Sequence, residues 1–173
     1  MKKIILLSFC LCALLTTSMA QSYQGRNMDF LTDEKYFKLE LDYSLVSNNL
    51  AFKTDEEIQE WESGQSLKEL TDECIKCLNE KLEERGCHLR ASNIKPAKYR
   101  VIISVTRLTR GGNTNADIYF KPVDSDNTLY ITALYGDGGR VGTVVNLMGD
   151  GIRSLAVKLG RFIDSKTHAP ARK

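Results

Sequence analysis

The chain has little of what many small enzymes use for catalysis. It has 173 residues but only two histidines, His88 and His168, and three prolines. Neither a Gly-x-Ser-x-Gly elbow nor a Ser-x-x-Lys motif is present, so the sequence offers no familiar serine nucleophile. It also lacks internal repeats and low-complexity tracts, which excludes a repeat architecture. The sequence therefore predicts no catalytic residues and no cofactor, and a small hydrolase is an alternative for which it names no residue set.

Long apolar runs are also scarce, and the longest one lies at the start of the chain. Met1-Lys2-Lys3 is basic, residues 4–15 are almost entirely apolar, and small residues precede and include Ala20. This order of charge, hydrocarbon and small residues is typical of a secretory signal peptide. The run is about 12 residues long, whereas a membrane span needs roughly 20. We therefore expect cleavage after Ala20 and a mature chain that starts at Gln21, without a membrane span.

The N-terminal segment does not fit a lipoprotein signal. Cys10 and Cys12 lie inside the apolar run, whereas a lipidation signal places small residues directly before a cysteine at its end. The expected location is therefore the periplasm or the medium, without a lipid anchor.

Charge is unevenly distributed along the mature chain. Residues 21–84 carry 16 acids and 7 bases, whereas residues 85–173 carry 6 acids and 15 bases. The two halves compensate each other, so the basic character of the whole sequence comes from Lys2 and Lys3. Scattered and compensated bases argue against nucleic acid as a partner, because nucleic-acid sites cluster Lys and Arg on one surface.

Hydrophobic periodicity predicts a strand followed by helices in the first half of the chain. Residues 36–45 alternate apolar and polar, as in a half-buried strand. Capping boxes at 54–57 and 66–69 then predict a short helix and a long one. Gly86 stands where a left-handed C-cap would end the long helix. The apolar positions of that helix at helical spacing are Leu67, Leu70, Cys74, Cys77, Leu78 and Leu82.

The second half predicts three strands and a final helix. Alternation over 99–106, 116–121 and 129–135 is interrupted by Gly111-Gly112 and by a polar turn at 124–127. Short connections favour an antiparallel meander. Apolar residues at helical spacing then extend from Met148 to Ile163.

These elements predict an α+β two-layer sandwich. Its sheet would be mainly antiparallel, with about four strands (one N-terminal strand and the three-strand meander), and two long helices would back it. We expect residues 1–20 to be the signal peptide, 21–165 a single domain and 166–173 a flexible tail.

The cysteines offer one candidate for chemistry. Cys74 and Cys77 form a C-x-x-C pair, with Cys87 and His88 nearby in sequence. A thiol-redox or zinc protein using these residues is the alternative function. The pair lies two turns inside the predicted helix, however, away from the helix start that lowers a thiol pKa. Small apolar side chains on a buried helix face are the simpler interpretation.

A glycine-rich loop, residues 136–142, offers a second candidate. Such loops can hold phosphate with backbone amides, but Val141 stands where a dinucleotide fingerprint needs glycine. The simpler interpretation is that Gly136 and Gly138-Gly139 supply positive φ for a sharp turn and that Gly142 allows close approach to the helix. Arg140 remains a candidate for holding an anion or the carboxylate of a partner.

The third candidate is a surface. If the odd-numbered residues of strand 129–135 face the helices, the opposite face of the sheet carries more apolar and aromatic side chains than solvent exposure requires. Such surface often marks a partner site, although the segment around Phe30 or the short helix with Ile58 and Trp61 could cover it. The residues concerned are Ile102, Leu108, Tyr119, Tyr130 and Leu134.

The order of elements also resembles a known group. A strand entered by residues 97–101, two more strands, the loop from Gly138 to Gly142 and a closing amphipathic helix are similar to uncharacterised small secreted envelope proteins of Gram-negative bacteria. More distantly, they resemble anticodon-binding-like periplasmic modules of envelope lipoproteins. The resemblance covers roughly residues 36–165 and implies binding or assembly rather than catalysis. Gln21 replaces the lipidated cysteine of those lipoproteins.

The leading hypothesis is a non-catalytic binding or assembly domain of the cell envelope. Its binding residues would be Ile102, Tyr119, Tyr130 and Leu134 on the sheet and Gly138, Gly139 and Arg140 on the loop. The expected partner is an envelope protein or a second copy of the chain.

Overall fold

The computed structural model describes residues 28–45 and 64–167. The predicted short helix and the predicted signal peptide lie outside these residues. The elements in chain order are η2 (Asp29–Leu31), β1 (Tyr36–Asp42), α3 (Gly64–Glu84), β2 (Arg90–Ala91), β3 (Tyr99–Leu108), β4 (Thr114–Pro122), β5 (Tyr130–Gly136) and α4 (Val144–Thr167).

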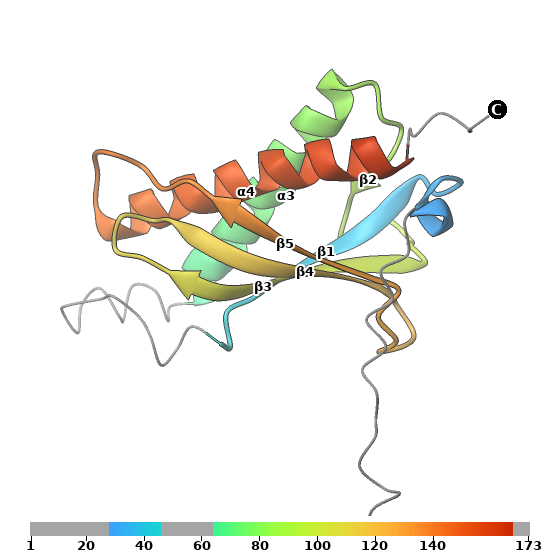
Figure 1. Cartoon of the computed structure of the whole chain (residues 1–173), viewed down its shortest axis with the longest axis horizontal. Helices are drawn as coiled ribbons and strands as arrows, with labels where there is room; N and C mark the ends of the chain where they lie inside the picture. Colours follow the sequence, from blue (N-terminus) through green and yellow to red (C-terminus); the bar gives the residue numbers. More distant parts are fainter. Residues whose placement is uncertain (1–27, 46–63, 168–173) are drawn as a thin grey trace, which may run out of the picture.

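The predicted α+β two-layer sandwich is confirmed. Five strands form one mixed sheet in the order β2-β1-β3-β4-β5, and both long helices lie on the same side of it (Figure 1). The three-strand meander is present as β3-β4-β5, while β1 pairs in parallel with both β2 and β3. The short strand β2 is an addition to the four strands expected.

The core lies between the helices and one face of the sheet, which we call the inner face. Strand side chains alternate between faces, so every second residue of β3 and β4 points toward the helices. On the three central strands these residues are at most 1% exposed: Leu39, Val101, Ile103, Val105, Ala116, Ile118 and Phe120. Their burial is the main driving force for placing the two helices.

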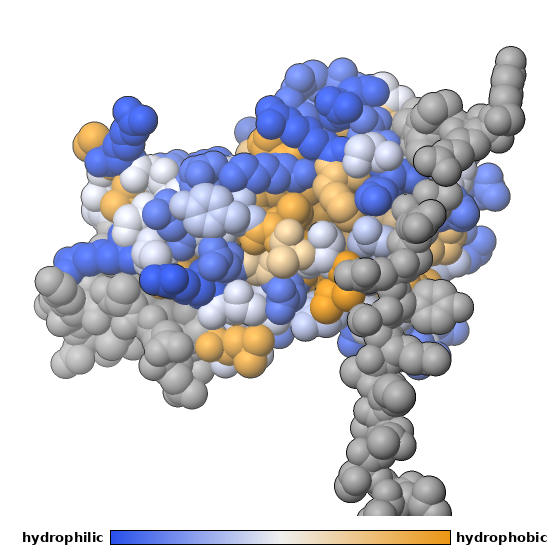
Figure 2. Space-filling model, in the orientation of Figure 1, coloured by the Kyte–Doolittle hydropathy of each residue, from blue (hydrophilic) through white to orange (hydrophobic). Residues whose placement is uncertain are grey.

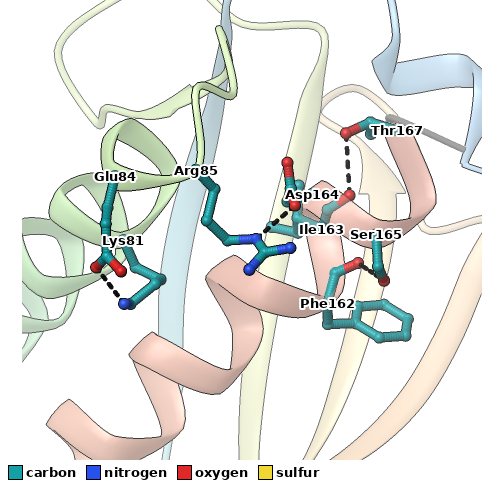
Figure 3. A network of polar contacts seen from close by, with 8 residues as sticks. All are labelled: Lys81, Glu84, Arg85, Phe162, Ile163, Asp164, Ser165 and Thr167. Atoms are coloured by element: carbon teal, nitrogen blue, oxygen red, sulfur yellow. Dashed lines mark hydrogen bonds and ion pairs between the residues drawn. The ribbon is translucent and has the colours of Figure 1, made fainter.

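Helices α3 and α4 run in the same general direction across the inner face. Arg153 of α4 donates to Glu73 of α3 at 2.7 Å, and a Cβ at Gly160 would lie 3.0 Å from Cγ of Lys81, so the helices approach closely there. At the C-terminal ends, Arg85 donates to Asp164 across the two helices (Figure 3). The Asp164 side chain is only 9% exposed, so this ion pair joins the C-terminal ends of the two helices where solvent has little access to the carboxylate.

Gly86 ends α3 as predicted. It has a φ of 71°, and the amide of Cys87 donates to the carbonyl oxygen of Leu82 at 2.9 Å. The Gly86 amide donates to Glu83 at 2.8 Å, which completes a Schellman motif. Helix α4 extends to Thr167, so Lys166 and Thr167 are helical rather than part of the expected tail.

Side-chain amides cap one edge of the sheet. The Asn93 amide bonds both the N–H and the carbonyl of Leu39 at 2.9 Å. In the same way Asn79 of α3 bonds the N–H and the carbonyl of Ala91. Both asparagines satisfy backbone groups that an edge strand would otherwise present to another chain.

Candidate functional site

The side of the sheet that faces away from α3 and α4 is the candidate site, and we call it the outer sheet face. Residues paired directly across strands share a face, so the pairing places Ile102 with Tyr119 and Ile131 on this side. Its residues alternate with the buried inner-face residues: Lys38, Glu40, Asp42, Arg100, Ile102, Ser104, Asp117, Tyr119, Lys121, Ile131 and Ala133.

The outer sheet face is ordered into three rows that cross the strands. The basic row consists of Lys38, Arg100 and Lys121. The apolar row consists of Ile102, Tyr119 and Ile131, with Glu40 at its β1 end. The acidic row consists of Asp42, Ser104 and Asp117, with Ala133 at its β5 end. The face therefore carries positive charge on one side of an apolar centre and negative charge on the other.

Exposed acids partly balance the basic row. Arg100 donates to Asp126 at 2.8 Å and lies 3.7 Å from Glu40, while Lys121 lies 3.8 Å from Asp126. The Asp126 side chain is 91% exposed, so these contacts are screened by solvent and stabilise little. The Lys121 ammonium also lies 5.8 Å from the centre of the Tyr119 ring, which joins the basic row to the apolar row.

The acidic row keeps its charge. The backbone amide of Ser44 donates to Asp42 at 2.9 Å, and the Ser104 hydroxyl donates to the same carboxylate at 3.2 Å. These bonds, that of the Ser44 amide first, hold the pKa of Asp42 below its ordinary value. Asp42 is therefore ionised throughout the neutral range.

Two residues predicted for this face lie on the other side. Tyr130 pairs with Phe120 and Leu134 pairs with Ala116, so both point toward the helices. The Tyr130 ring lies 5.8 Å from that of Phe162 on α4. The prediction that odd-numbered residues of β5 face the helices is wrong, and Ile131, which it hid, belongs to the outer sheet face.

Tyr130 and Leu134 of β5 instead pack beside α4. Tyr130, Leu134 and Phe162 are partly buried there against the core. Figure 2 shows apolar residues gathered between α4 and the sheet, bordered by hydrophilic ones. These side chains complete the packing of the two layers.

A β-bulge explains why a third residue, Leu108, was predicted for the wrong face. The register between β3 and β4 shifts between Val105 and Arg107, and an extra residue reverses which side chains face inward. Leu108, predicted for the outer face, is therefore only 5% exposed on the inner side.

The segment around Phe30 does not cover the outer sheet face. The Phe30 ring lies 5.1 Å from that of Tyr99 and 6.4 Å from that of Phe120. Because Phe120 belongs to the inner face, Phe30 extends the core. The other expected cover, with Ile58 and Trp61, lies outside the described residues.

The glycine-rich loop is built for close packing. Positive φ occurs at Gly142 but not at Gly136, Gly138 or Gly139, so the expected reason for those three glycines is wrong. A Cβ at Gly138 would lie 1.8 Å from the carbonyl oxygen of Gly111, and one at Gly136 would lie 2.0 Å from that of Gly151. Only glycine lets the loop approach the β3-β4 turn and α4 so closely.

The first loop amides already have acceptors. The amide of Asp137 donates to Ser154 at 3.0 Å, and that of Gly138 donates to Asn113 at 2.9 Å. A phosphate at this position would have to replace both bonds. Arg140 is exposed and follows β5, so its loop lies at the end of the sheet beyond the acidic row.

The surroundings of Cys74 and Cys77 disfavour a reactive thiol. Cys74 is fully buried, and burial raises the pKa of its thiol to about 12. Burial also raises the pKa of Cys77, while Cys87 belongs to the cap of α3. Nε2 of His88 lies 2.9 Å from the carbonyl oxygen of Thr32. Raised pKa values disfavour the thiolate that redox chemistry and zinc binding need.

In residues 28–45 and 64–167 there is no group of three or more His, Cys, Asp or Glu side chains that could hold a metal ion. Among the helices of that same part of the chain, none is long and apolar enough to cross a membrane.

Comparison with known proteins gives distant structural matches alone. No protein-family model and no curated protein matches the chain. A PelC dodecamer from Paraburkholderia phytofirmans is 14% identical, with 85% of this chain and 94% of that chain covered and a TM-score of 0.37. A single-substitution variant of it is 12% identical, with 81% and 90% covered and a TM-score of 0.38.

A third solved structure covers less of the chain. It is a protein of Caulobacter crescentus CB15, provisionally described as a lipoprotein, with 16% identity and a TM-score of 0.26. The match covers 51% of this chain and 75% of that one. At these TM-scores the matches assign neither a family nor a function, and the resemblance to anticodon-binding-like modules stays a prediction.

Proposed function

We propose that the mature domain is a non-catalytic binding or assembly module of the bacterial cell envelope and that the outer sheet face is its binding surface. The observation that carries this proposal is the apolar row on the side of the sheet that faces away from α3 and α4. Ile102, Tyr119 and Ile131 lie side by side there between charges of opposite sign. An apolar centre with a charged border is the usual anatomy of a protein interface.

The polar groups of the face support binding rather than catalysis. Arg100 and Lys121 are engaged by Asp126, and Asp42 is hydrogen-bonded and ionised. A general acid or base needs a pKa near the working pH, whereas the pKa of Asp42 is shifted away from neutrality. The charges of this face are suited to orienting a partner.

The envelope location follows from the N-terminal segment. We propose that export removes residues 1–20, since the basic start, short apolar run and Ala20 match a signal peptide. The intact mass of the protein recovered from the periplasm or the medium of an expressing bacterium should correspond to a chain that starts at Gln21. Retention of the full-length mass in the cytoplasm would contradict the proposed location.

Site-specific photo-crosslinking in cells tests the binding surface. A photoreactive amino acid at Tyr119 should give a discrete adduct in the envelope fraction, because Tyr119 lies in the middle of the apolar row. The matched control is the same amino acid at Arg161, which is exposed on α4 in the helix layer. Adducts of equal yield at both positions, or none at Tyr119, would refute the outer sheet face as the binding surface.

Arg140 lies on the loop that follows β5 at the end of the sheet, and we propose a secondary role for it. Arg140 is exposed, and its guanidinium is suited to donating hydrogen bonds to a carboxylate of the partner. Arg140→Ala should lower the yield of the Tyr119 adduct without removing it, and Arg140→Lys should restore part of it. An unchanged yield in Arg140→Ala would limit the surface to the strands.

A further inference from the structure

We propose that the outer sheet face binds the outer sheet face of a second copy of this chain, in a two-fold symmetric dimer. This inference rests on the proposed function, because it takes the same face as the binding surface. It adds the identity of the partner. The observation behind it is the order of the rows, basic on one side of the apolar row and acidic on the other.

The three rows complement their own rotated image. Neighbouring rows are two residues apart along each strand, about 7 Å, so the basic and acidic rows lie at nearly equal distances on either side of the apolar row. A two-fold axis that lies in the interface along the apolar row reverses the strand direction and keeps the strand order. Each basic row then lies over the acidic row of the other copy.

The rotation makes specific pairs. Lys121 faces Asp117 of the second copy, and Lys38 faces its Asp42. Ile102, Tyr119 and Ile131 face their own counterparts and form the apolar centre. Two packed sheets lie about 10 Å apart, which is a distance that lysine and aspartate side chains can bridge from opposite faces. Because the interface has two-fold symmetry, each pair occurs twice.

The remaining charges of the face are compatible with this arrangement. Glu40 lies at the β1 end of the apolar row, near its counterpart, but it is 3.7 Å from Arg100 of its own chain and so keeps a balancing charge. Asp126 contacts both Arg100 and Lys121 of the basic row. Its side chain is 91% exposed, so pairing across the interface displaces contacts that stabilise little. A different protein would need the same three rows at the same spacing, whereas a second copy already has them.

A charge exchange within the face tests the pairing. Lys121→Asp and Asp117→Lys, each alone, place like charges opposite each other at two symmetric positions. Each should raise the dimer dissociation constant by about tenfold or more in sedimentation velocity over a concentration series. The double variant restores opposite charges across the interface and should return the constant to within about threefold of the native value.

Restoration by the double variant cannot come from a contact within one chain. Residues 117 and 121 lie four positions apart on β4, about 13 Å, so their side chains do not pair with each other. At a concentration where every chain is monomeric, the circular dichroism spectra of all three variants should match that of the native chain, and their urea midpoints should differ little from it. Both residues are only partly buried, and substitutions at such positions usually change stability little. This control separates loss of association from loss of fold.

The outcomes separate the dimer from the broader function. Weakening by each single change and recovery in the double variant would support the proposed dimer. A native chain that stays monomeric at all concentrations would overturn it, as would a dimer that neither single change weakens. If the Tyr119 adduct then contains another envelope protein, the proposed function holds while the dimer fails; an adduct with the mass of two copies supports both.

Discussion

The two faces of the sheet are formed by the same strands but differ in burial and in the order of their side chains. On β4, Ile118 is 0% exposed beneath the helices, while its neighbour Tyr119 lies half-buried in the apolar row of the outer face. The inner face is mostly apolar, with Thr114 and Thr132 as polar members, whereas the outer face sorts its side chains into charged and apolar rows. The difference teaches that packing against α3 and α4 accounts for the apolar residues of the inner face but not for the order of the outer one. That unexplained order is the reason for assigning function to the outer face.

The largest expected effect concerns the close packing of α4 against the backbone of the β3-β4 turn. A Cβ at Gly151 of α4 would lie 1.9 Å from the carbonyl oxygen of Gly112 and 2.6 Å from Oγ1 of Thr114. Neither atom can move away easily, because the Gly112 oxygen belongs to the backbone and the Thr114 side chain is buried. Gly151→Ala should therefore cost about 4 kcal/mol or prevent folding, as measured by urea unfolding.

Gly149 in the same helix provides the matched control. A Cβ there would find its nearest atoms at 3.6 Å, in the side chain of Arg153, which is ordinary contact. Gly149→Ala should leave stability unchanged or raise it by up to about 1 kcal/mol, because alanine favours the helix. Equal destabilisation by both changes would mean that close approach at Gly151 does not determine the position of α4.

Neighbouring truncations on β4 compare the two faces directly. Ile118→Ala removes buried methyl groups and leaves a cavity, so we expect a loss of about 3 kcal/mol. Tyr119→Ala should cost about 1 kcal/mol or less when measured at a concentration where the chain is monomeric. The two changes lie one residue apart, so urea unfolding of both variants isolates the face as the variable. Similar losses would contradict the division between an inner packing face and an outer binding face.

A smaller effect concerns the pH dependence of the core. Burial raises the pKa of Cys74 to about 12, against an ordinary value of 9.0, so above pH 9 the unfolded chain releases a proton that the folded chain keeps. Stability is therefore fully present below about pH 9 and falls as the pH rises toward about 12, by at most about 1.4 kcal/mol per pH unit from this group. Cys74→Ala should show a flatter alkaline loss.

Cys77 and Tyr43 serve as comparisons for this prediction. Cys77 is more accessible and its pKa is raised less clearly, so Cys77→Ala should change the alkaline slope less than Cys74→Ala. Burial also raises the pKa of Tyr43, which should leave part of the alkaline loss in both variants. An unchanged slope in Cys74→Ala, from urea unfolding at several alkaline pH values, would show that Cys74 is not protected by the core.

Some positions of the candidate site could be predicted because their strands carry apolar residues at one set of alternate positions and mostly polar residues at the other. Around Ile102 and Tyr119, the alternate positions are occupied by residues such as Val101, Ile103 and Phe120, which fill the core. In β5, apolar and aromatic residues occupy both sets of alternate positions, Tyr130 and Leu134 as well as Ile131 and Tyr135. Periodicity then cannot determine which set faces inward, and the prediction for Tyr130 and Leu134 was wrong.

Other features depend on contacts between distant segments. The bulge after Val105 is not visible as a break in the apolar pattern, so Leu108 was assigned to the wrong face. The reason for the glycines of residues 136–139 appears only where the loop meets Gly111 and Gly151. The asparagines that cap the sheet edge, Asn79 and Asn93, likewise gave no local signal, because their partners lie 12 and 54 residues away.

The sequence alone determined the types of the longer elements, the two-layer α+β class and the left-handed C-cap of α3, because hydrophobic period and helix-end chemistry are local properties of the chain. Only the tertiary structure decided that β1 lies between β2 and β3, that Tyr130 faces the helices and that basic, apolar and acidic rows align across four strands. The physical reason is register: a row exists only when residues far apart in sequence are brought side by side by strand pairing.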